Sequence, residues 1–384
     1  MFAAVRALTP EITERASEAE EKLGVPPDIH QKLTHAGAFR MYLPKSVGGE
    51  GLTLAEGMRV IEEVSRGDGS TGWSVMVGAV WGILWTHFPA AFVHDVFAGG
   101  PDVLARGAVA PKGTAEVTDG GYRVKGRWPF GSGSYENQWV WANCIVTQNG
   151  IPRIGPSGVP EMRMVVLPAE QVEFLDTWNV VGMRASSSDD FVIDDKFVPA
   201  EHTGDIFDGA ASTFDGPLYR LPFRVSLSPT LSAIVLGVAA GALEDLKALA
   251  KVKRPSFNPA ITIAEDPVVQ YKIGQLEVRL AAARAFNYEA VEEIWGRVAA
   301  GAHLQPIEGV RVRAMVAHVH TECMAIVNEA FSLSGSNAIY NASALQRRWR
   351  DVRAASQHLG ASPETFGILG ALELDQDVSP MATD

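Results

Sequence analysis

The pattern of apolar and polar positions divides the chain into three parts. Over residues 9–97, apolar residues recur every three or four positions between proline, glycine and capping residues, which predicts a series of helices. Residues 103–199 instead show short runs of alternating apolar and polar side chains separated by turn residues, which predicts strands. Helical patterns return from residue 229 onward, and the longest of them cover 267–298 and 306–333.

The chain is therefore predicted to have an α+β fold made of consecutive domains. A small β domain is enclosed in the sequence by two helical regions, and the second of these is long enough to form an antiparallel bundle. The expected parts are an N-terminal α-helical domain (1–102), a middle β domain (103–200), a linker (201–225) and a C-terminal four-helix bundle (226–384).

Individual residues refine the predicted helices. Thr9 is a candidate N-cap, because Pro10 follows it at the expected first turn of a helix. Thr53 is followed three residues later by Glu56, which is the signature of a capping box. Asn287 interrupts the apolar stripe of the 267–298 helix. We expect its side chain to form a hydrogen bond with a neighbouring helix, because buried amides usually have partners.

Two uncharged runs, residues 69–94 and 225–243, approach the length that spans a membrane. Gly72, Gly78 and Pro89 interrupt the first run, and the second begins with serines, so buried helices of a bundle explain both runs better. The N-terminal residues lack the basic region and apolar stretch of a secretory signal. We therefore expect no membrane segment and a cytoplasmic location.

Composition and charge exclude several classes of function. The 384 residues are 47% hydrophobic and 20% charged, which is typical of a large globular protein, and their formal net charge is −12. Because no basic tract is present to neutralise phosphates, we do not expect the chain to bind nucleic acid. Cys144 and Cys323 lie in apolar contexts without paired spacing, so we expect neither a disulfide framework nor a metal site.

The stretch 120–141 is the leading candidate for a binding site. Alternating side chains over residues 122–127 predict a strand, and the Trp-Pro-Phe-Gly-Ser-Gly sequence that follows interrupts its pairing. Trp128 and Phe130 would form walls for a flat, amphipathic ring, with Ser132 as the hydrogen-bonding group. An edge strand with a glycine bulge is the alternative interpretation.

Five segments, in order along nearly the whole chain, resemble the acyl-CoA dehydrogenase fold. The resemblance implies a helical domain, a β domain and a helical bundle, in agreement with the pattern. The segments are Leu-Pro to Gly-Gly-Glu-Gly-Leu (43–52), Gly-Tyr-Arg-Val-Lys-Gly (121–126), Trp-Asn-Val-Val-Gly-Met-Arg-Ala-Ser-Ser-Ser (178–188), Phe-Val-Pro (197–199) and Arg-Asp-Val-Arg (350–353).

Two features distinguish the branches of this superfamily. Many dehydrogenases carry a catalytic Glu shortly before the Arg-Asp motif, whereas residues 334–345 contain no acid. The segments 350–358, which ends in His358, and 126–133, which contains Ser132, resemble the two-component (group D) flavin-dependent monooxygenases. Dehydrogenation of an acyl thioester is the alternative within the fold, and a catalytically silent binding subunit is the alternative from another class.

The monooxygenase resemblance implies a reaction and its reactants. Reduced FAD or FMN, with FAD favoured, comes from a separate NAD(P)H:flavin reductase and reacts with O2 to give a C4a-hydroperoxide, which transfers one oxygen atom to an aromatic substrate. In agreement, no glycine-rich dinucleotide motif follows a strand pattern in the chain. The family also implies a homotetramer, and the apolar C-terminal helices offer surface for it.

The resemblance further implies roles for individual residues. Ser132 matches the residue that hydrogen bonds flavin N5. His358 matches the residue beside the N1/C2 carbonyl edge, where an imidazolium would favour anionic reduced flavin. The other implied flavin contacts are Phe130, Gly133, Arg184, Ser186 and Ser188.

Two aligned positions indicate the class of substrate. Phenol-hydroxylating relatives carry a His and a Ser near the substrate hydroxyl, where this chain has Val80 and Ala108. Because these residues cannot deprotonate a phenol, we predict an apolar aromatic substrate such as an indole or a polycyclic compound. His87 could supply a polar contact after a shift of register. The aromatic residues of this neighbourhood, which would suit a flat apolar ring, are Trp73, Trp81, Trp85 and Phe88, and we expect at least two of the four to be helix core instead.

Overall fold

The structure, a computed structural model, describes residues 1–133, 138–155, 158–206, 211–256 and 258–379. Helices, a sheet and helices again follow one another along the chain, which confirms the predicted α+β fold class. Residues 134–137 of the 120–141 stretch and residues 207–210 of the predicted linker lie outside the described residues. The boundaries assigned to the domains stay a prediction.

Helices fill the first hundred residues, as the apolar pattern predicts. The predicted capping box is present at the start of α4: the Glu56 backbone N–H donates to Thr53 Oγ1 at 3.2 Å, and the Thr53 backbone N–H donates to the Glu56 carboxylate at 2.9 Å. The α-helices of this part are α1 (Phe2–Glu14), α2 (Ala16–Glu21), α3 (Pro27–His35), α4 (Leu54–Gly67), α5 (Gly69–Leu84) and α6 (Ala90–Val96).

The predicted start of the first helix is wrong. Helix α1 begins at Phe2, and Thr9 lies inside it with only 1% of its surface exposed, next to Pro10. Val5, Thr9 and Ile12 share the buried face of α1. Burial of this face therefore continues the helix through a Thr-Pro pair that more often marks a helix start.

Within the described residues, eight strands form one sheet in the order β6-β7-β2-β1-β3-β5-β8, with β4 paired to β3. Strands β1 and β3 run parallel, and the other pairs are antiparallel. The strands are β1 (Ala105–Thr118), β2 (Gly121–Trp128), β3 (Trp139–Gln148), β4 (Ile151–Pro152), β5 (Met162–Pro168), β6 (Glu173–Phe174), β7 (Phe191–Pro199) and β8 (Thr203–Gly204).

Trp128 is a core residue of the sheet and not the predicted wall of a ring site. Its side chain is fully buried, and its Nε1 donates to the Asn143 carbonyl on β3 at 2.7 Å. Gly113 makes room for the indole, since a Cβ there would lie 2.0 Å from Trp128 Cζ2. The ring therefore points into the core on one face of the sheet, whereas the next aromatic residue, Phe130, is 65% exposed.

The C-terminal part is a bundle around α7. Helix α7 has a mean hydropathy of 1.7 over a length that could span a membrane, but 89% of that segment is buried inside the protein. It is therefore a core helix, as predicted for 225–243 from the sequence. The α-helices here are α7 (Phe223–Ala250), α8 (Pro267–Ala299), α9 (Pro306–Ser334), α10 (Ala344–Ala355) and α11 (Glu364–Glu373).

The predicted hydrogen bond from Asn287 to a neighbouring helix is wrong. Asn287 is completely buried in α8, as its position in the apolar stripe predicts. Neither amide atom, however, has a hydrogen-bond partner among the described residues. Within the described residues, Asn287 therefore does not form the interhelical hydrogen bond that we expected.

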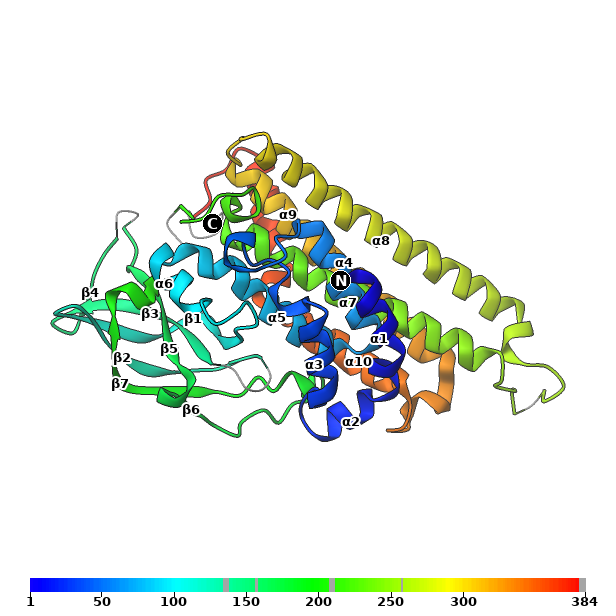
Figure 1. Cartoon of the computed structure of the whole chain (residues 1–384). Helices are drawn as coiled ribbons and strands as arrows, with labels where there is room; N and C mark the ends of the chain where they lie inside the picture. Colours follow the sequence, from blue (N-terminus) through cyan, green and yellow to red (C-terminus); the bar gives the residue numbers. More distant parts are fainter. Residues whose placement is uncertain (134–137, 156–157, 207–210, 257, 380–384) are drawn as a thin grey trace.

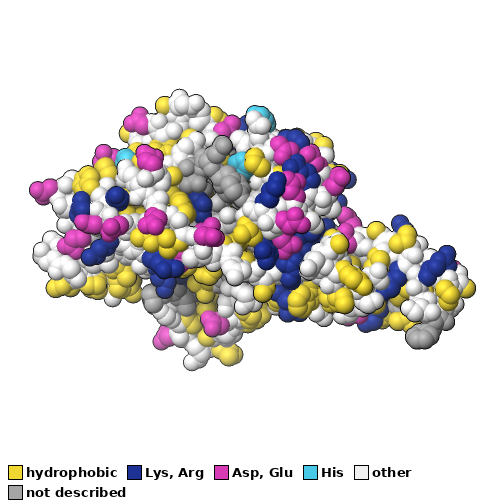
Figure 2. Space-filling model, turned by 90° about the horizontal axis from the view of Figure 1, so that it is seen from below, with side chains coloured by type: hydrophobic (Ala, Val, Ile, Leu, Met, Phe, Trp, Pro, Cys, Tyr) yellow, Lys and Arg dark blue, Asp and Glu magenta, His cyan; other side chains and the backbone are white. Residues whose placement is uncertain are grey.

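The sheet and the bundle lie side by side, with α5 and α6 next to the sheet (Figure 1). Two apolar cores cover the two faces of the sheet, and a third fills the bundle. Helix α8 runs along the outside of the bundle, and its N-terminal part projects together with the C-terminal end of α7 as an arm (Figure 1). Figure 2 shows acidic and basic side chains interspersed over one face, and hydrophobic side chains gathered along the arm.

Candidate active site

Three buried serine hydroxyls form a row between two loops. Ser132 Oγ lies 2.7 Å from Ser188 Oγ, which lies 2.8 Å from Ser186 Oγ. Ser132 follows β2, and the other two serines precede β7. Because the antiparallel ladder between these strands continues to the pair Trp128 and Phe191, the segments beyond it are held side by side. The structure thus brings together three of the predicted flavin contacts.

The backbone of both loops is held in an uncommon conformation. Phe130, Met183 and Ser187 have φ angles of 61°, 57° and 48°, which place non-glycine residues in the left-handed region. Such residues persist only where surrounding contacts fix them, and they concentrate at functional sites. One of these contacts crosses the loops, since the Gly131 N–H donates to the Asp189 carbonyl at 2.9 Å.

The surroundings of the serine row suit a flat ring with polar edges. The exposed Phe130 ring stands edge-on to Trp178, with 6.1 Å between centroids. Gly133 lies close to Arg106, because a Cβ at Gly133 would be 2.7 Å from Arg106 Cβ. Arg184, in the 3-10 turn η5 (Arg184–Ser186), is partly exposed, and its Nε lies 3.9 Å from Glu20. An exposed aromatic ring, hydroxyls and a guanidinium match the chemistry of a flavin.

His358 lies at the start of the 3-10 turn η10 (Leu359–Ala361), on the C-terminal side of the site. Its Nδ1 accepts the Gly360 N–H at 3.0 Å, so the neutral ring carries its proton on Nε2. Burial lowers the pKa of His358 to about 4. The predicted imidazolium is therefore not favoured, because desolvation penalises the charged ring; the neutral Nε2–H is still a hydrogen-bond donor.

Helix α5 connects His358 to the rest of the site. The Trp73 ring of α5 lies edge-on to the His358 ring, with 5.8 Å between centroids. The Trp73 Nε1 atom is buried and has no hydrogen-bond partner among the described residues. The same helix packs against the turn η5 that carries Arg184 and Ser186. Elements from all three parts of the chain therefore meet around α5.

Trp81 faces the sheet near the serine row. It stacks on Trp141 of β3, with centroids 5.1 Å apart and an angle of 6° between the rings. Trp141 is opposite Gly107 in the β1–β3 ladder, and Gly107 in turn forms a bridge with Ser132. Ala108, the next residue of β1, is buried. Trp81 is therefore linked to Ser132 through Trp141 and Gly107, and Ala108 follows Gly107 in the same strand.

The remaining residues predicted for the substrate pocket lie in different parts of the structure. Val80 is buried in the core of the helical bundle, whereas Ala108 belongs to the core on the far face of the sheet. His87 ends the 3-10 turn η3 (Trp85–His87), which follows α5. Trp85 and Phe88 are at most 1% exposed and pack on Trp141, so they are core residues and not pocket walls. Their rings fill the space between α6 and the sheet.

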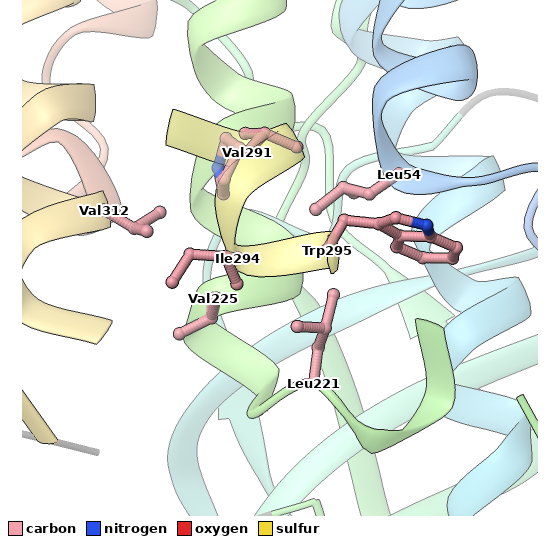
Figure 3. Close-up of a pocket in the computed structure, with 8 residues that line it drawn as sticks. Leu54, Leu221, Val225, Val291, Ile294, Trp295 and Val312 are labelled. Carbon is pink, nitrogen blue, oxygen red and sulfur yellow. The ribbon is translucent and has the colours of Figure 1, made fainter. Parts of the chain in front are cut away.

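Two hollows in the structure lie away from these residues. Figure 3 shows a cavity of about 10 Å³ between α7, α8 and α9, lined by apolar side chains such as Leu221, Ile294 and Val312. A volume of this size holds at most one water molecule. A second hollow of about 330 Å³ lies between the Ser46–Gly48 loop and the segment after α6, beside Phe97. The predicted flavin contacts line neither hollow.

Arg106 is a site residue that the sequence analysis missed. Its Nε donates to the Gly131 carbonyl at 3.0 Å, and its Nη2 donates to the Ser187 carbonyl at 3.2 Å. The guanidinium carbon lies 3.7 Å from the centre of the Phe174 ring. A lone arginine within the apolar run 103–109 was the available signal, since a charged side chain there requires a specific partner.

Asp351 is a second missed residue, although the Arg-Asp motif was noted. Its carboxylate accepts the Met183 N–H at 2.6 Å and is completely buried. Burial, together with the nearby Asp68 carboxylate, raises the pKa of Asp351 to about 7. Arg350 donates to the Val181 carbonyl at 2.6 Å. The motif therefore anchors the 178–188 turn from the helical bundle.

The described residues offer no alternative centre based on metal or thiol chemistry. No group of three or more His, Cys, Asp or Glu side chains among them could hold a metal ion. Cys144 and Cys323 are free and buried. Burial raises the pKa of both thiols, which makes them unreactive near neutral pH.

The fold and two family models define the class of the protein. The model "Acyl-CoA dehydrogenase, N-terminal domain" matches residues 2–87, and "Acyl-CoA dehydrogenase, C-terminal domain" matches residues 229–363. The crystal structure of the HsaA monooxygenase from M. tuberculosis superimposes with a TM-score of 0.90 at 26% identity, covering 99% of this chain and 98% of that one. The chain therefore has the acyl-CoA dehydrogenase fold.

Curated relatives identify the branch. Indole-3-acetate monooxygenase from Acinetobacter baumannii is 31% identical, over 97% of this chain and 94% of its own length. The oxygenase subunit HsaA of a flavin-dependent monooxygenase from Rhodococcus jostii is 29% identical, over 94% of this chain and 95% of its own length. The chain belongs to the flavin-dependent monooxygenases of the acyl-CoA dehydrogenase fold, which act with reduced flavin and O2.

Proposed function

We propose that the protein hydroxylates an indole-like or fused aromatic compound, with reduced flavin delivered by a separate NAD(P)H:flavin reductase. The observation that carries the proposal is the row of three buried hydroxyls beside the exposed ring of Phe130, where a flavin would place one polar edge. FAD is favoured over FMN, and we expect the reaction in the cytoplasm. Bound reduced flavin supplies the electrons that activate O2.

The chain's own residues hold and shield that flavin. Ser132 would form a hydrogen bond to flavin N5, and Ser188 and Ser186 continue the row of hydroxyls behind it. The neutral His358, whose Nδ1 accepts the Gly360 N–H, would donate its Nε2–H to the carbonyl edge of the flavin ring. The flavin contacts completing the proposed set are Phe130, Gly133 and Arg184. Because the three serines are buried, they would keep water away from the edge of a bound flavin.

The proposed substrate contacts are mainly apolar, and Val80, Trp81 and Ala108 each belong to a different packed core of the structure. Val80 and Ala108 are 5% and 6% exposed, and neither can remove a proton. Trp81 offers an aromatic wall that is already stacked on Trp141. An indole or fused aromatic needs no base, because its own π system makes the attacked carbon electron-rich, whereas a phenol gains reactivity by losing its proton. His87 is the one titratable residue in the proposed set of substrate contacts.

The named activity of one relative supports the same class of compound. The Acinetobacter baumannii protein, at 31% identity, is an indole-3-acetate monooxygenase. The alternative, dehydrogenation of an acyl thioester, lacks its base, since residues 334–345 around the end of α9 contain no acid. Proton removal from the α-carbon of a thioester would require such a group within hydrogen-bond reach.

A competition assay tests the substrate class. With a flavin reductase, NADH, flavin and O2, an indole and a carboxylated phenol are supplied at equal concentration, and the products are separated. We expect hydroxylated indole to exceed hydroxylated phenol by at least about tenfold, because an unassisted neutral phenol lacks the contribution of a general base. Efficient hydroxylation of the phenol with the indole untouched would contradict the proposal. In that case, loss of phenol turnover in His87→Leu would identify the base.

We also propose that four copies of the chain assemble, with α8 in the contact. Along the arm, large apolar side chains face solvent: Val268, Tyr271 and Val278 are 65–69% exposed. The opposite face of α8 is buried against the bundle through residues such as Leu276 and Leu280. A long helix with apolar residues on both sides leaves one face for another subunit.

Light scattering on the purified chain tests this assembly. We expect the mass of a tetramer at micromolar concentration, and a lower mass for Val278→Lys, because a charge in an apolar contact disfavours association. Ile151→Lys is the matched control, since Ile151 is also 69% exposed but lies on β4, away from α8. A wild-type monomer at these concentrations would disprove the assembly.

A further inference from the structure

Arg106 holds the carbonyl that immediately precedes each of two serines in the row. It donates to the Gly131 carbonyl, one residue before Ser132, and to the Ser187 carbonyl, one residue before Ser188. Its side chain is 9% exposed. One guanidinium therefore connects the two loops at the positions where displacement would move both hydroxyls.

The two loops depend on such a connection, because their backbones are strained. Phe130 and Ser187 both have backbone angles in the left-handed region. Arg106 binds the carbonyl of Ser187 itself and, in the other loop, the carbonyl of Gly131, which follows Phe130. The Phe174 ring lies 3.7 Å from the guanidinium carbon and fixes its plane. The planar fork of an arginine can reach two carbonyls at set angles, which the single ammonium of a lysine cannot do.

We propose that Arg106 is a positioning residue that sets the Ser132–Ser188 hydroxyl pair by binding the preceding carbonyl of each loop. The inference rests on the proposed flavin site, in which Ser132 contacts flavin N5. Arg106 acts through the backbone, because it binds the Gly131 and Ser187 carbonyls. Its contribution is to keep the Ser132 hydroxyl aligned, with Ser188 as its neighbour at 2.7 Å.

Alignment of Ser132 decides how oxygen is used. In the productive reaction, reduced flavin, O2 and substrate give oxidised flavin, hydroxylated substrate and water. In the unproductive one, reduced flavin and O2 give oxidised flavin and H2O2. Both oxidise the flavin by two electrons. When folded protein is in excess over reduced flavin, little flavin is oxidised free in solution, and the ratio of H2O2 to product then measures positioning.

The first experiment measures how firmly the two loops are held together, in the absence of flavin and substrate. Peptide-resolved hydrogen exchange follows the Gly131 amide, which donates across the loops to Asp189. In Arg106→Lys we expect this amide to exchange at least about tenfold faster, because a charge-assisted hydrogen bond is lost. Arg123→Lys is the control, since Arg123 pairs with Asp195 on the surface of the same sheet, and its exchange at Gly131 should equal that of wild type. Unchanged exchange in Arg106→Lys would overturn the proposal.

The second experiment measures the ratio of H2O2 to product in a single turnover, with folded protein in excess over reduced flavin and with saturating substrate. Arg106→Lys should raise this ratio about tenfold. In a Ser188→Ala background the same change should raise it much less, because the two residues act on one hydroxyl pair. Faster exchange with an unchanged ratio would show a purely structural role and reject Arg106 as a positioning residue.

A milder variant covers the case in which Arg106→Lys does not fold. Phe174→Leu leaves both carbonyl contacts in place but removes the ring under the guanidinium. It should raise both the exchange rate of the Gly131 amide and the ratio of H2O2 to product by about two- to fivefold. No change in either quantity would then overturn the proposal. If wild type forms no hydroxylated aromatic at all, the proposed function fails, and the exchange measurement alone decides whether Arg106 fixes the loops.

Discussion

Replacement of Ser132 by alanine is expected to turn a coupled hydroxylase into a producer of H2O2. Product formed per O2 consumed should fall by at least about tenfold, because single positioned hydrogen-bonding groups contribute factors of about 100 or more to such reactions. The hydroxyl lies at one end of the row, and Ser188 keeps Ser186 as a partner after the change. The measurement is the amount of product and of H2O2 from a known amount of O2.

The fold should survive this substitution. Loss of one small hydroxyl with a satisfied neighbour costs on the order of 1 kcal/mol. Ser332→Ala is the matched control: Ser332 is exposed on α9, where its Oγ donates to the Asn328 carbonyl, so its loss should leave product yield unchanged. Coupling in Ser132→Ala equal to that of wild type would mean that Ser132 does not contact the flavin.

The order of elements could be predicted because it depends on local pattern. The capping box at Thr53 and the helices over 267–298 and 306–333 follow from short-range residue types, and the structure has them as α4, α8 and α9. The start of α1 could not be predicted in the same way. There, burial of Val5 and Thr9 against other helices outweighs the local Thr-Pro signal.

The candidate site shows the same division. Ser132, Ser186 and Ser188 could be selected from two short motifs, and the structure places their hydroxyls in one row. Arg106 and Asp351 could not, because their partners are backbone atoms of loops more than twenty residues away in sequence. The role of Trp128 was misjudged for a related reason: its direction depends on space left by Gly113 in the neighbouring strand.

The protonation state of Asp351, which anchors the 178–188 turn to the helical bundle, should affect the stability of the folded protein. Its carboxylate faces Asp68, and Arg347 lies 4.0 Å from Asp68. The pKa of Asp351 in the folded protein, about 7, is above the usual value for an aspartate. A raised folded pKa stabilises the protein below the unfolded pKa of about 4, and this contribution is lost as the pH rises through 7.

Two buried histidines act in the opposite direction over part of this range. Burial lowers the pKa of His320 to about 3 and that of His358 to about 4. A histidine with a lowered folded pKa stabilises the protein above its usual pKa of about 6.5, and this contribution is lost as the pH falls. The pH profile of wild type alone therefore mixes both effects, and only a difference between variants isolates Asp351.

Asp351→Asn should become more stable relative to wild type as the pH rises from 5 to 8. The amide oxygen still accepts the Met183 N–H, while the buried charge beside Asp68, which destabilises the folded protein when Asp351 is ionised, is removed. The measurement is the difference in urea midpoint between variant and wild type at several pH values. Asp195→Asn is the control: Arg123 holds the pKa of the exposed Asp195 below its usual range, so its difference should stay flat above pH 5. A flat difference for Asp351→Asn as well would show that Asp351 is ionised throughout, and that Arg347 and Arg350 compensate its burial.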